Sequence, residues 1–568
     1  MAQNDLSILR HSAAHLAAQA ILELYPGTLL TIGPATEEGF FYDFLPPRNL
    51  KEEDLHAIEE RMHELSKKNY PLKHRDISKD EARALFKNNP FKLEMIDEIP
   101  SDMVGLSEQG DFKDLCRGGH VTSTGEIKHF KLLGLSGSYW RADKSKQALQ
   151  RIHGTAFFTA EELSAFEKHQ EDLLQYDHRR LGKQLDYFSL HDDAAGFPFF
   201  HPKGQQIIMT LMAYMRQLHK EYDYKEIATP TVLNADLWRR SGHYHHYKEN
   251  MYFSEIDGTQ YAIKPMNCPG AFLIFGHHPR SYRELPLKLA EFGHVHRFEL
   301  SGVLHGLLRV RAFTIDDTHI FCTLEQVEQE ILKILEIAFR VLKKCDFTSI
   351  NLAVSTRPAK SMGSDAEWKL ATKALEDALT KFGQPFAIQE GEGAFYGPKI
   401  EIVIKDAMGR AWQTGTVQVD FFQAQNFDLT YVSAEGKQER PVIIHQAIYG
   451  SLERFFAILL EHYKGHLPFW LAPVQIRILT ITEGQDAYAQ DLYARLKKEG
   501  MRVEVDLSSD KITSKVKSAQ LAKIPWMLVV GNKEVEAGTV SIRYADGKQE
   551  LGVSLDVLLK KAHELNAV

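Results

Sequence analysis

The sequence predicts an α+β chain built from several domains, and three observations lead to this prediction. At 568 residues the chain is too long for one hydrophobic core, so two to four domains are expected. The middle of the chain mixes amphipathic helices irregularly with extended segments, and VQVDF alternates like a strand. The last hundred residues repeat strand and helix patterns. We therefore expect an N-terminal α/β domain, a central antiparallel sheet flanked by helices, and a small C-terminal α/β domain.

Composition is typical of an ordinary globular protein, with 44% hydrophobic and 25% charged residues. The net charge of -8 excludes a protein coated in basic charge but permits a local basic surface for phosphates. Four cysteines are too few for a disulfide framework, and the first residues do not resemble a signal peptide. No apolar run approaches the length, about eighteen residues, that spans a bilayer. We expect a cytoplasmic protein with reduced thiols and no membrane partner.

Residues 1 to about 160 mix short helix and strand patterns around a group of histidines and a cysteine. His11 and His15 in HSAAH are four apart, on one face of an expected helix. Cys116 and His120 in DLCRGGH are four apart around a Gly-Gly turn. This spacing predicts a zinc site, and the alternative is that the four are unconnected core or surface residues.

A charged stretch that begins at Thr159, TAEELSAFEKHQEDLLQYDHRRLGKQLDYFSL, has apolar residues at helical spacing. We interpret it as a solvated linker helix.

Two features of the middle segment suggest a site for a polyphosphate. GHVHRFELSGVLHGLLRVRAF places Arg297 and Glu299 two apart on an expected strand, hence on one face, and Arg309 follows after a loop. GSLERF begins an apolar helix and adds Arg454. The guanidinium fork binds phosphate oxygens in pairs, although surface ion pairing is the commoner fate of a single arginine.

The C-terminal segment begins after LPFWLAP, in which Pro468 and Pro473 mark a boundary. The expected strands are VQIRILTIT, MRVEVDL, PWMLVVG and TVSIRY, and the expected helices are QDAYAQDLYARLKKEG and DKITSKVKSAQLAK.

Together with Pro230 in YKEIATPTVL, these features resemble, in their order and spacing, the three motifs of class II aminoacyl-tRNA synthetases. MNCPG, DDTHIF, AFYGPKIEI, WQTGTVQVDF and IHQAIYGSLERF resemble the threonyl-tRNA synthetases specifically, and the resemblance covers essentially the whole chain. It implies an editing domain at 1–160, a linker helix at 161–182, a class II catalytic domain at 183–468 and an anticodon-binding domain at 469–568. It also implies a homodimer, through the Pro230 segment, with threonine, ATP and tRNA(Thr) as substrates.

The resemblance assigns one Zn²⁺ per subunit to Cys268, His319 and His445, with an open fourth position. Threonine and valine are nearly isosteric, and an apolar pocket separates such a pair by only roughly a hundredfold. Zinc that binds the amino group and the β-hydroxyl together makes the hydroxyl obligatory. Serine lacks only a methyl group, worth about 1–3 kcal/mol, so we expect it to be activated as well.

The remaining implied residues bind the substrates. By resemblance, threonine is surrounded by Asp317, Tyr396 and Gln418, and ATP with Mg²⁺ by Arg297, Arg309, Lys399, Gln413, Ser451 and Arg454. His243 in SGHYHHY matches a histidine proposed to help activate the terminal ribose hydroxyl of tRNA. Ile315 stands where the family usually has Gln, which removes one polar contact with the substrate.

The N-terminal cluster resembles the editing domain of bacterial threonyl-tRNA synthetases, which hydrolyses Ser-tRNA and in which a metal is not thought essential. This implies a second, hydrolytic site that removes serine attached to the tRNA in error. The matching residues are His11, His15, Tyr42, Lys92, Asp114, Cys116 and His120. Because His11 lies near the first residue, we expect the small extra N-terminal domain of many bacterial members to be missing.

In the C-terminal domain, Glu534 and Arg543 match positions that read anticodon bases. Four lysines crowd one expected helix and indicate either phosphate contacts or a solvated face: Lys511, Lys515, Lys517 and Lys523.

Three alternatives stay open at this point. A prolyl or seryl enzyme would lack the combined Cys268, His319 and His445 set. A non-catalytic RNA-binding or regulatory paralogue would be expected to lose Arg297, Arg454 or a zinc ligand. A stand-alone editing factor would not need a complete ATP site.

Overall fold

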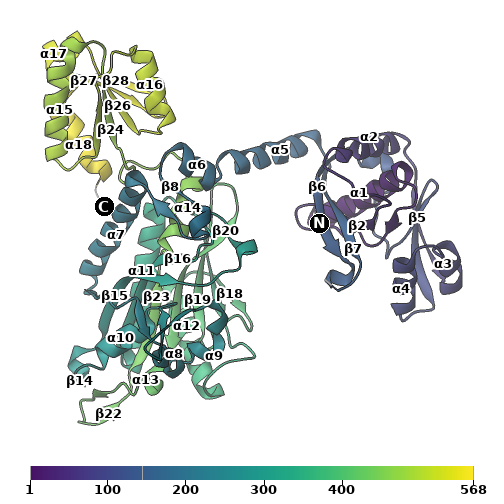
Figure 1. Cartoon of the computed structure of the whole chain (residues 1–568), viewed down its shortest axis with the longest axis horizontal. Helices are drawn as coiled ribbons and strands as arrows, with labels where there is room; N and C mark the ends of the chain where they lie inside the picture. Colours follow the sequence, from purple (N-terminus) through teal and green to yellow (C-terminus); the bar gives the residue numbers. More distant parts are fainter. Residues whose placement is uncertain (1, 144, 567–568) are drawn as a thin grey trace. The chain divides into compact units, whose positions relative to one another are not determined.

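The computed structural model describes residues 2–143 and 145–566, and the chain divides into two compact units, Met1–Asp172 and Leu173–Val568 (Figure 1). Within the described ranges, no helix is long and apolar enough to cross a membrane.

The N-terminal unit packs a long helix, α1, against an antiparallel sheet of order β1-β2-β7-β6. Buried residues recur along α1 at helical spacing, from Leu9 through Ala13 and Leu16 to Ala20. The unit also contains a second antiparallel sheet, β3-β4-β5, and the Cys116 segment comes directly after β5. The elements are α1 (Ala2–Leu24), β1 (Leu29–Leu30), β2 (Phe40–Leu45), α2 (Asp54–Lys67), β3 (Leu72–Ser78), α3 (Lys79–Leu85), α4 (Pro90–Glu98), β4 (Met103–Gln109), β5 (Phe112–Leu115), β6 (His129–Tyr139) and β7 (Ala148–Phe157).

The charged stretch forms two helices rather than one. In α5 (Ala160–Gln175) none of the residues is buried, which agrees with the predicted solvated helix. In α6 (His178–Gln184) His178, Leu181 and Gly182 are buried, and α6 packs against α14 (Leu452–His462). The end of the predicted linker is therefore part of a folded core.

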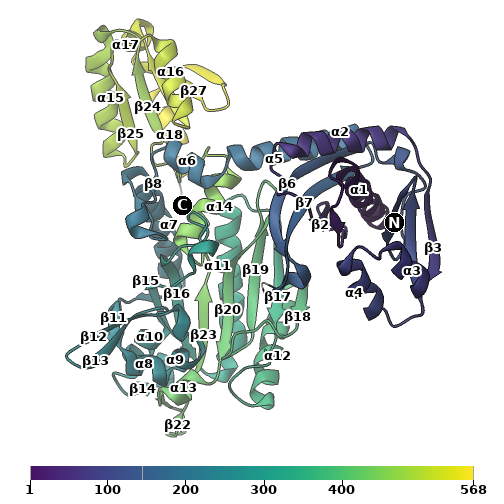
Figure 2. The same cartoon turned by 45° about the vertical axis from the view of Figure 1, so that its right-hand side comes forward.

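The C-terminal unit is built on an eight-stranded sheet of order β10-β15-β16-β23-β20-β19-β17-β18, and Figure 2 labels all of these strands except β10. Only the β10–β15 and β17–β18 pairs are parallel, so the predicted antiparallel sheet is confirmed. Helices α11 and α12 pack on the face that presents Ile320, Ile444 and Val417. The sheet strands are β10 (Lys225–Glu226), β15 (Leu287–His296), β16 (Ala312–Cys322), β17 (Ile350–Ser355), β18 (Phe386–Gln389), β19 (Lys399–Lys405), β20 (Ala411–Asp420) and β23 (Val442–Ala447).

Shorter elements surround this sheet. The helices are α7 (Pro202–Glu221), α8 (Ala235–Arg240), α9 (His243–His246), α10 (Cys268–Phe275), α11 (Val327–Lys344), α12 (Asp365–Phe382) and α13 (Gln423–Asn426). The small strands are β8 (Phe188–Ser189), β9 (Phe199–Phe200), β11 (Val232–Asn234), β12 (Tyr252–Ile256), β13 (Thr259–Ile263), β14 (Arg280–Ser281), β21 (Tyr431–Val432) and β22 (Gln438–Glu439).

The last hundred residues form a mixed sheet of order β25-β24-β26-β27-β28. All four predicted strands and both predicted helices are present, and α17, β28 and α18 are additional. The elements are β24 (Ile476–Thr480), α15 (Asp486–Lys498), β25 (Val503–Asp506), α16 (Ile512–Leu521), β26 (Trp526–Val530), α17 (Asn532–Ala537), β27 (Thr539–Tyr544), β28 (Gln549–Ser554) and α18 (Leu555–Asn566).

Candidate functional sites

Four of the predicted residues form a row across the central sheet. The register pairs His319 of β16 with His445 of β23, His445 with Gln418 of β20, and Gln418 with Lys399 of β19. Residues paired in this way project from the same face of a sheet. Asp317 faces the same side because it lies two residues before His319. This face lies opposite the apolar face that α11 and α12 cover.

A cysteine joins this row at the start of α10. The Sγ atom of Cys268 and one ring nitrogen each of His319 and His445 lie within 4.8 Å of one another. Nε2 of His319 and Nδ1 of His445 are buried and have no hydrogen-bond partner among the described residues. Nε2 of His445 lies 3.0 Å from Oδ2 of Asp420. Unpaired buried nitrogens are costly, whereas a thiolate with two imidazoles, one oriented by an outer carboxylate, is a common zinc ligand set. The residues present fit such an ion.

Burial is the main influence on the pKa values of Cys268 and His319. It raises the pKa of the Cys268 thiol well above its usual value, and the charges of Asp317 and Asp420 raise it further. Burial also lowers the pKa of His319 well below its usual range, with His445 adding to the effect. The imidazole is therefore already in its neutral, metal-binding form, and the thiol needs a nearby cation to lose its proton.

The three residues predicted to surround threonine lie around this trio. Asn267 Nδ2 donates to Oδ2 of Asp317 at 3.0 Å, and burial raises the pKa of Asp317 to about 6. The ring of Tyr396 lies 5.4 Å from the ring of His445, centroid to centroid. Gln418 is buried, and its Nε2 donates to the carbonyl of Gly397 at 3.3 Å.

A pocket of about 350 Å³ beside this row gathers most of the predicted ATP residues. Burial lowers the pKa of Arg454, and the charge of Arg309 lowers it further, so the two guanidinium groups repel each other there. Such a repulsion is relieved by a bound anion. The residues of the predicted set that line the pocket are Arg297, Arg309, Gln413, Ser451 and Arg454, and Ile315 lines it as well.

Three details differ from expectation or refine it. Strand β15 ends at His296, so Arg297 and Glu299 follow the strand instead of lying on it, and both still line the pocket. Lys399 does not line the pocket, and its Nζ pairs with Oε1 of Glu401 at 2.6 Å. His243 is buried at the start of α9, with its ring centroid 6.2 Å from that of Tyr396.

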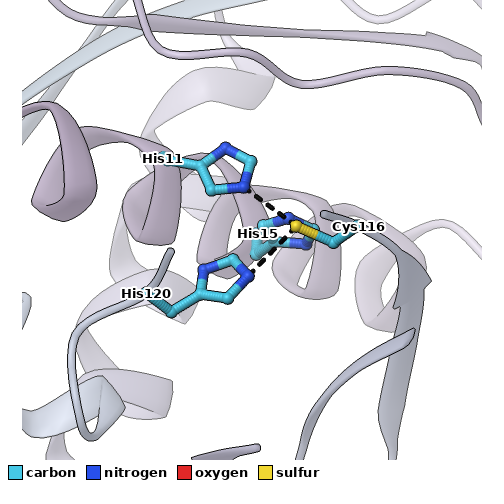
Figure 3. A group of neighbouring side chains, drawn as sticks. All are labelled: His11, His15, Cys116 and His120. Atoms are coloured by element: carbon cyan, nitrogen blue, oxygen red, sulfur yellow. Dashed lines mark hydrogen bonds between the residues drawn. The ribbon is translucent and has the colours of Figure 1, made fainter. Parts of the chain in front are cut away.

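In the N-terminal unit, the predicted histidine and cysteine residues meet around one sulfur atom (Figure 3). Sγ of Cys116 lies 3.0 Å from Nε2 of His11 and 3.2 Å from Nε2 of His120. The ring of His15 lies 4.8 Å from that of His120, centroid to centroid. Burial opposes ionisation of Cys116, but the hydrogen bonds of His11, His120 and His15 outweigh it and bring the thiol pKa to about 2. The spacing argument thus correctly joined these four residues.

The three other predicted residues of this unit form a buried network beside the cluster. Asp114 accepts a hydrogen bond from Tyr42 Oη at 2.5 Å and pairs with Lys92. Its Oδ2 also lies 3.4 Å from Nδ1 of His15. A pocket of about 620 Å³ contacts His11, His15, Tyr42, Lys92, Asp114 and Cys116.

The C-terminal residues are less clustered. Glu534 of α17 accepts from Ser541 Oγ at 2.7 Å and from the amide of Gly531 at 3.0 Å, and Arg543 lies on β27. Lys515 is buried, and its Nζ donates to the carbonyls of Thr480 at 3.0 Å and Asp506 at 3.1 Å.

The expectation that Lys515 meets phosphate or solvent is therefore wrong, because its ammonium group satisfies buried carbonyls. Lys523 lies beyond the end of α16, with Nζ 2.8 Å from Nε2 of His466, while Lys511 and Lys517 are exposed.

Three family models match the chain. Residues 104–153 match the threonyl and alanyl tRNA synthetase second additional domain, residues 252–463 the class II tRNA synthetase core domain (G, H, P, S and T), and residues 475–565 an anticodon binding domain. A threonine–tRNA ligase of Desulfatibacillum aliphaticivorans is 49% identical over 98% of this chain and 88% of that protein. A threonine–tRNA ligase of Caldanaerobacter subterraneus subsp. tengcongensis is 50% identical over 97% of this chain and 86% of that protein.

The chain belongs to the threonyl-tRNA synthetase family.

Solved structures agree. The RNA binding domain of threonyl-tRNA synthetase from Cryptosporidium parvum is 42% identical, with a TM-score of 0.67, over 68% of this chain and 98% of that one. A putative threonyl-tRNA synthetase from Aeropyrum pernix is 32% identical, with a TM-score of 0.61, over 69% and 95% of the two chains. Prolyl-tRNA synthetase from Cryptosporidium parvum is 17% identical, with a TM-score of 0.54, over 68% of this chain and 74% of that one. At this identity the likeness shows the fold alone. The prolyl and seryl alternatives are therefore set aside.

Sequence reasoning missed two buried carboxylates that support the synthetase site. Asp316, next to Asp317, accepts hydrogen bonds from the amides of Ile448, Tyr449 and Gly450 at 2.9–3.0 Å. Glu453 of α14 accepts from the amide of Thr314 at 2.9 Å. Asp316 fixes the segment before α14 against β16, and Glu453 fixes the first turn of α14 against the same strand. Their partners lie more than 130 residues away in sequence, so no local pattern signals them.

Proposed function

We propose that this chain activates threonine with ATP to threonyl-adenylate and transfers it to the 3′-terminal ribose of tRNA(Thr). The family supports the ligation reaction, with threonine, ATP and tRNA as substrates. Selectivity for threonine is supported most strongly by the buried trio of Cys268, His319 and His445, whose ligand atoms lie within 4.8 Å of one another.

We assign one zinc ion per subunit to this trio. A zinc ion held by these residues would supply a Lewis-acid centre able to bind an amino group and a hydroxyl oxygen. Threonine offers both groups, and valine offers only the amino group. The carboxylate of Asp317 and the side chains of Tyr396 and Gln418 surround the amino acid and hold it in one orientation.

In the activation step, a carboxylate oxygen of threonine attacks the α-phosphorus of ATP in line, and pyrophosphate leaves. Arg297, Arg309 and Arg454 line the pocket and neutralise the phosphate charge, together with the Mg²⁺ that accompanies ATP. Lys399, Gln413 and Ser451 complete the proposed nucleotide contacts. No side chain acts as a nucleophile. In the transfer step, the ribose hydroxyl attacks the carbonyl carbon of threonyl-adenylate, the bond to the phosphate oxygen breaks and AMP leaves, and His243 helps to remove the hydroxyl proton.

The N-terminal unit is proposed to hydrolyse mischarged Ser-tRNA(Thr). Water attacks the ester carbonyl, the bond to the ribose oxygen breaks, and serine and tRNA are released. His11, His15 and Cys116 line a pocket in which a water molecule can be positioned and deprotonated, and His120 contacts the sulfur of Cys116. Tyr42 and Lys92 hold Asp114 beside His15.

Further proposals concern assembly and RNA. Glu534 and Arg543 are proposed to contact the anticodon, the Pro230 segment to contribute to a homodimer, and the cytoplasm to be the place of action. The domain limits predicted from the sequence stay predictions.

Charging of tRNA(Thr) with labelled threonine tests the ligation, and release of serine from preformed Ser-tRNA(Thr) tests the editing. Robust threonine charging is expected, and His11→Ala is expected to abolish serine release without lowering the threonine charging rate. Tight tRNA binding without charging would instead support the non-catalytic paralogue.

A further inference from the structure

One buried histidine outside both sites, His178 of α6, contacts the loop that carries Arg309. Its Nδ1 lies 2.6 Å from Oε1 of Glu461, and its Nε2 lies 3.0 Å from the backbone nitrogen of Leu307. A backbone amide only donates, so Nε2 is the acceptor and the ring proton is on Nδ1. The geometry thus fixes one neutral tautomer, in which Nδ1 donates to Glu461.

The loop is shaped to meet this ring. A Cβ atom on Gly306 would lie 2.0 Å from Nε2 of His178, and Gly306 has φ +50°. Leu307 is fully buried. His305 and Arg309 close a tight turn around these two residues, with N–O distances of 3.2 and 3.3 Å in the two directions. The contact at Gly306 and Leu307 therefore holds the turn whose last residue is Arg309.

Arg309 has few other restraints. Its side chain is 56% exposed, and its Nε lies 3.3 Å from Oε2 of Glu299. A long exposed side chain is aimed by the backbone that bears it, because its own rotamers are loosely held. Ordering this loop before ATP arrives removes part of the entropy cost of binding.

Asp177, His178 and Glu461 also lie close enough together to suggest a metal site. Both nitrogens of His178 are already engaged, and Glu461 accepts further bonds from Arg410 and from the amide of His178. The hydrogen bonds of His178 to Glu461 and Leu307 link parts of the fold to one another, and they leave no imidazole lone pair for a metal ion.

We propose that His178 is a positioning residue for ATP binding, which holds the 305–309 turn through Leu307 so that Arg309 faces the Arg454 pocket. Glu461 fixes the tautomer that makes this possible. The inference rests on the proposed role of Arg309 in the ATP pocket. It links the linker segment, which the sequence placed outside the catalytic chemistry, to the first step of the reaction.

Two substitutions of His178 separate its two hydrogen bonds. His178→Asn keeps an amide donor near the position of Nδ1 and removes the acceptor for Leu307, whereas His178→Gln keeps an acceptor near Nε2. In ATP–pyrophosphate exchange, His178→Asn is expected to raise the KM for ATP about tenfold. The KM for threonine and kcat should stay within about twofold. His178→Gln should recover most of the ATP affinity, and Gly306→Ala should reproduce the defect from the loop side.

His219→Asn is the matched control, because His219 is a buried histidine on α7 without a hydrogen-bond partner among the described residues. It is expected to leave the KM for ATP unchanged. Thermal unfolding is measured for each variant.

An unchanged KM for ATP in stably folded His178→Asn and Gly306→Ala would overturn the proposal, as would a parallel rise of the KM values for ATP and threonine. If His178→Asn does not fold, His178→Gln and Gly306→Ala decide the question. Absence of exchange in the wild-type protein would contradict the proposed function instead. Equilibrium binding of ATP to wild-type and Gly306→Ala protein would then test, without catalysis, whether the contact between His178 and the 305–309 turn supports ATP binding.

Discussion

Replacing Lys92 with methionine is expected to destabilise the N-terminal unit by about 3 kcal/mol. Lys92 is 1% exposed, donates to the carbonyl of Thr31 at 2.6 Å and pairs with Asp114, which is 2% exposed. Methionine keeps the apolar stem but leaves the carboxylate of Asp114 buried without its cation. Removing one partner of a buried ion pair costs about 3–5 kcal/mol. We expect the lower end of this range because the hydroxyl of Tyr42 still donates to Asp114.

Hydrogen–deuterium exchange of peptides from β2 and α4 in the full chain measures the loss of stability of the N-terminal unit. The exchange of each peptide reports the local opening of its own region, so the C-terminal unit does not affect the result. Lys113→Met is the control, because Lys113 is 41% exposed and its pair with Glu108, at 3.3 Å, is worth at most about 1 kcal/mol. The double variant Lys92→Met/Asp114→Asn should cost less than the sum of the two single changes. Equal loss of protection in Lys92→Met and Lys113→Met would refute the reasoning.

Four further predictions follow from the same structure. Cys268→Ser should reduce bound zinc, measured by metal analysis, from one per chain to a small fraction, and full retention would exclude the assigned site. Ile315→Gln should lower the KM for ATP about fivefold by adding a polar contact, and exchange kinetics that show a rise would contradict this. Burial lowers the pKa of His219 to about 4. Between pH 6.5 and 4, His219 is therefore protonated in the unfolded chain but neutral in the folded chain. Stability should fall by about 1.4 kcal/mol per pH unit as the pH drops from 6.5 to 4, and His219→Phe should flatten this slope in unfolding curves. Lys515→Met should lower the melting temperature, whereas Lys517→Met should weaken tRNA binding. An unchanged melting temperature with weakened tRNA binding in Lys515→Met would show that the buried contacts of Lys515 contribute little to stability.

Local patterns predicted the elements of this fold well. HSAAH lies on a helix, Ser451 caps the helix that begins in GSLERF, and VQVDF lies on a strand. These features depend on periodicity and capping within a few residues, which the sequence displays directly. The four-residue spacing of Cys116 and His120 likewise pointed to a cluster that the structure assembles.

Long-range geometry was not readable in the same way. Cys268, His319 and His445 meet through strand register, and only the family resemblance joined them in advance. Lys515 was misjudged because charge on a helix usually indicates solvent, whereas here the ammonium group serves two internal carbonyls. The burial of His178 was not predicted because it lies in a charged segment, and its partner Glu461 is 283 residues away in the sequence.

The central claim is that a metal held by the buried trio lets the site select threonine by its hydroxyl. ATP–pyrophosphate exchange with threonine, serine and valine, before and after chelation and zinc replacement, tests it most directly. The account predicts strong exchange with threonine, weaker exchange with serine and none with valine, all lost on chelation and restored by zinc. Exchange with threonine that survives complete metal removal, or exchange with valine as fast as with threonine, would contradict it.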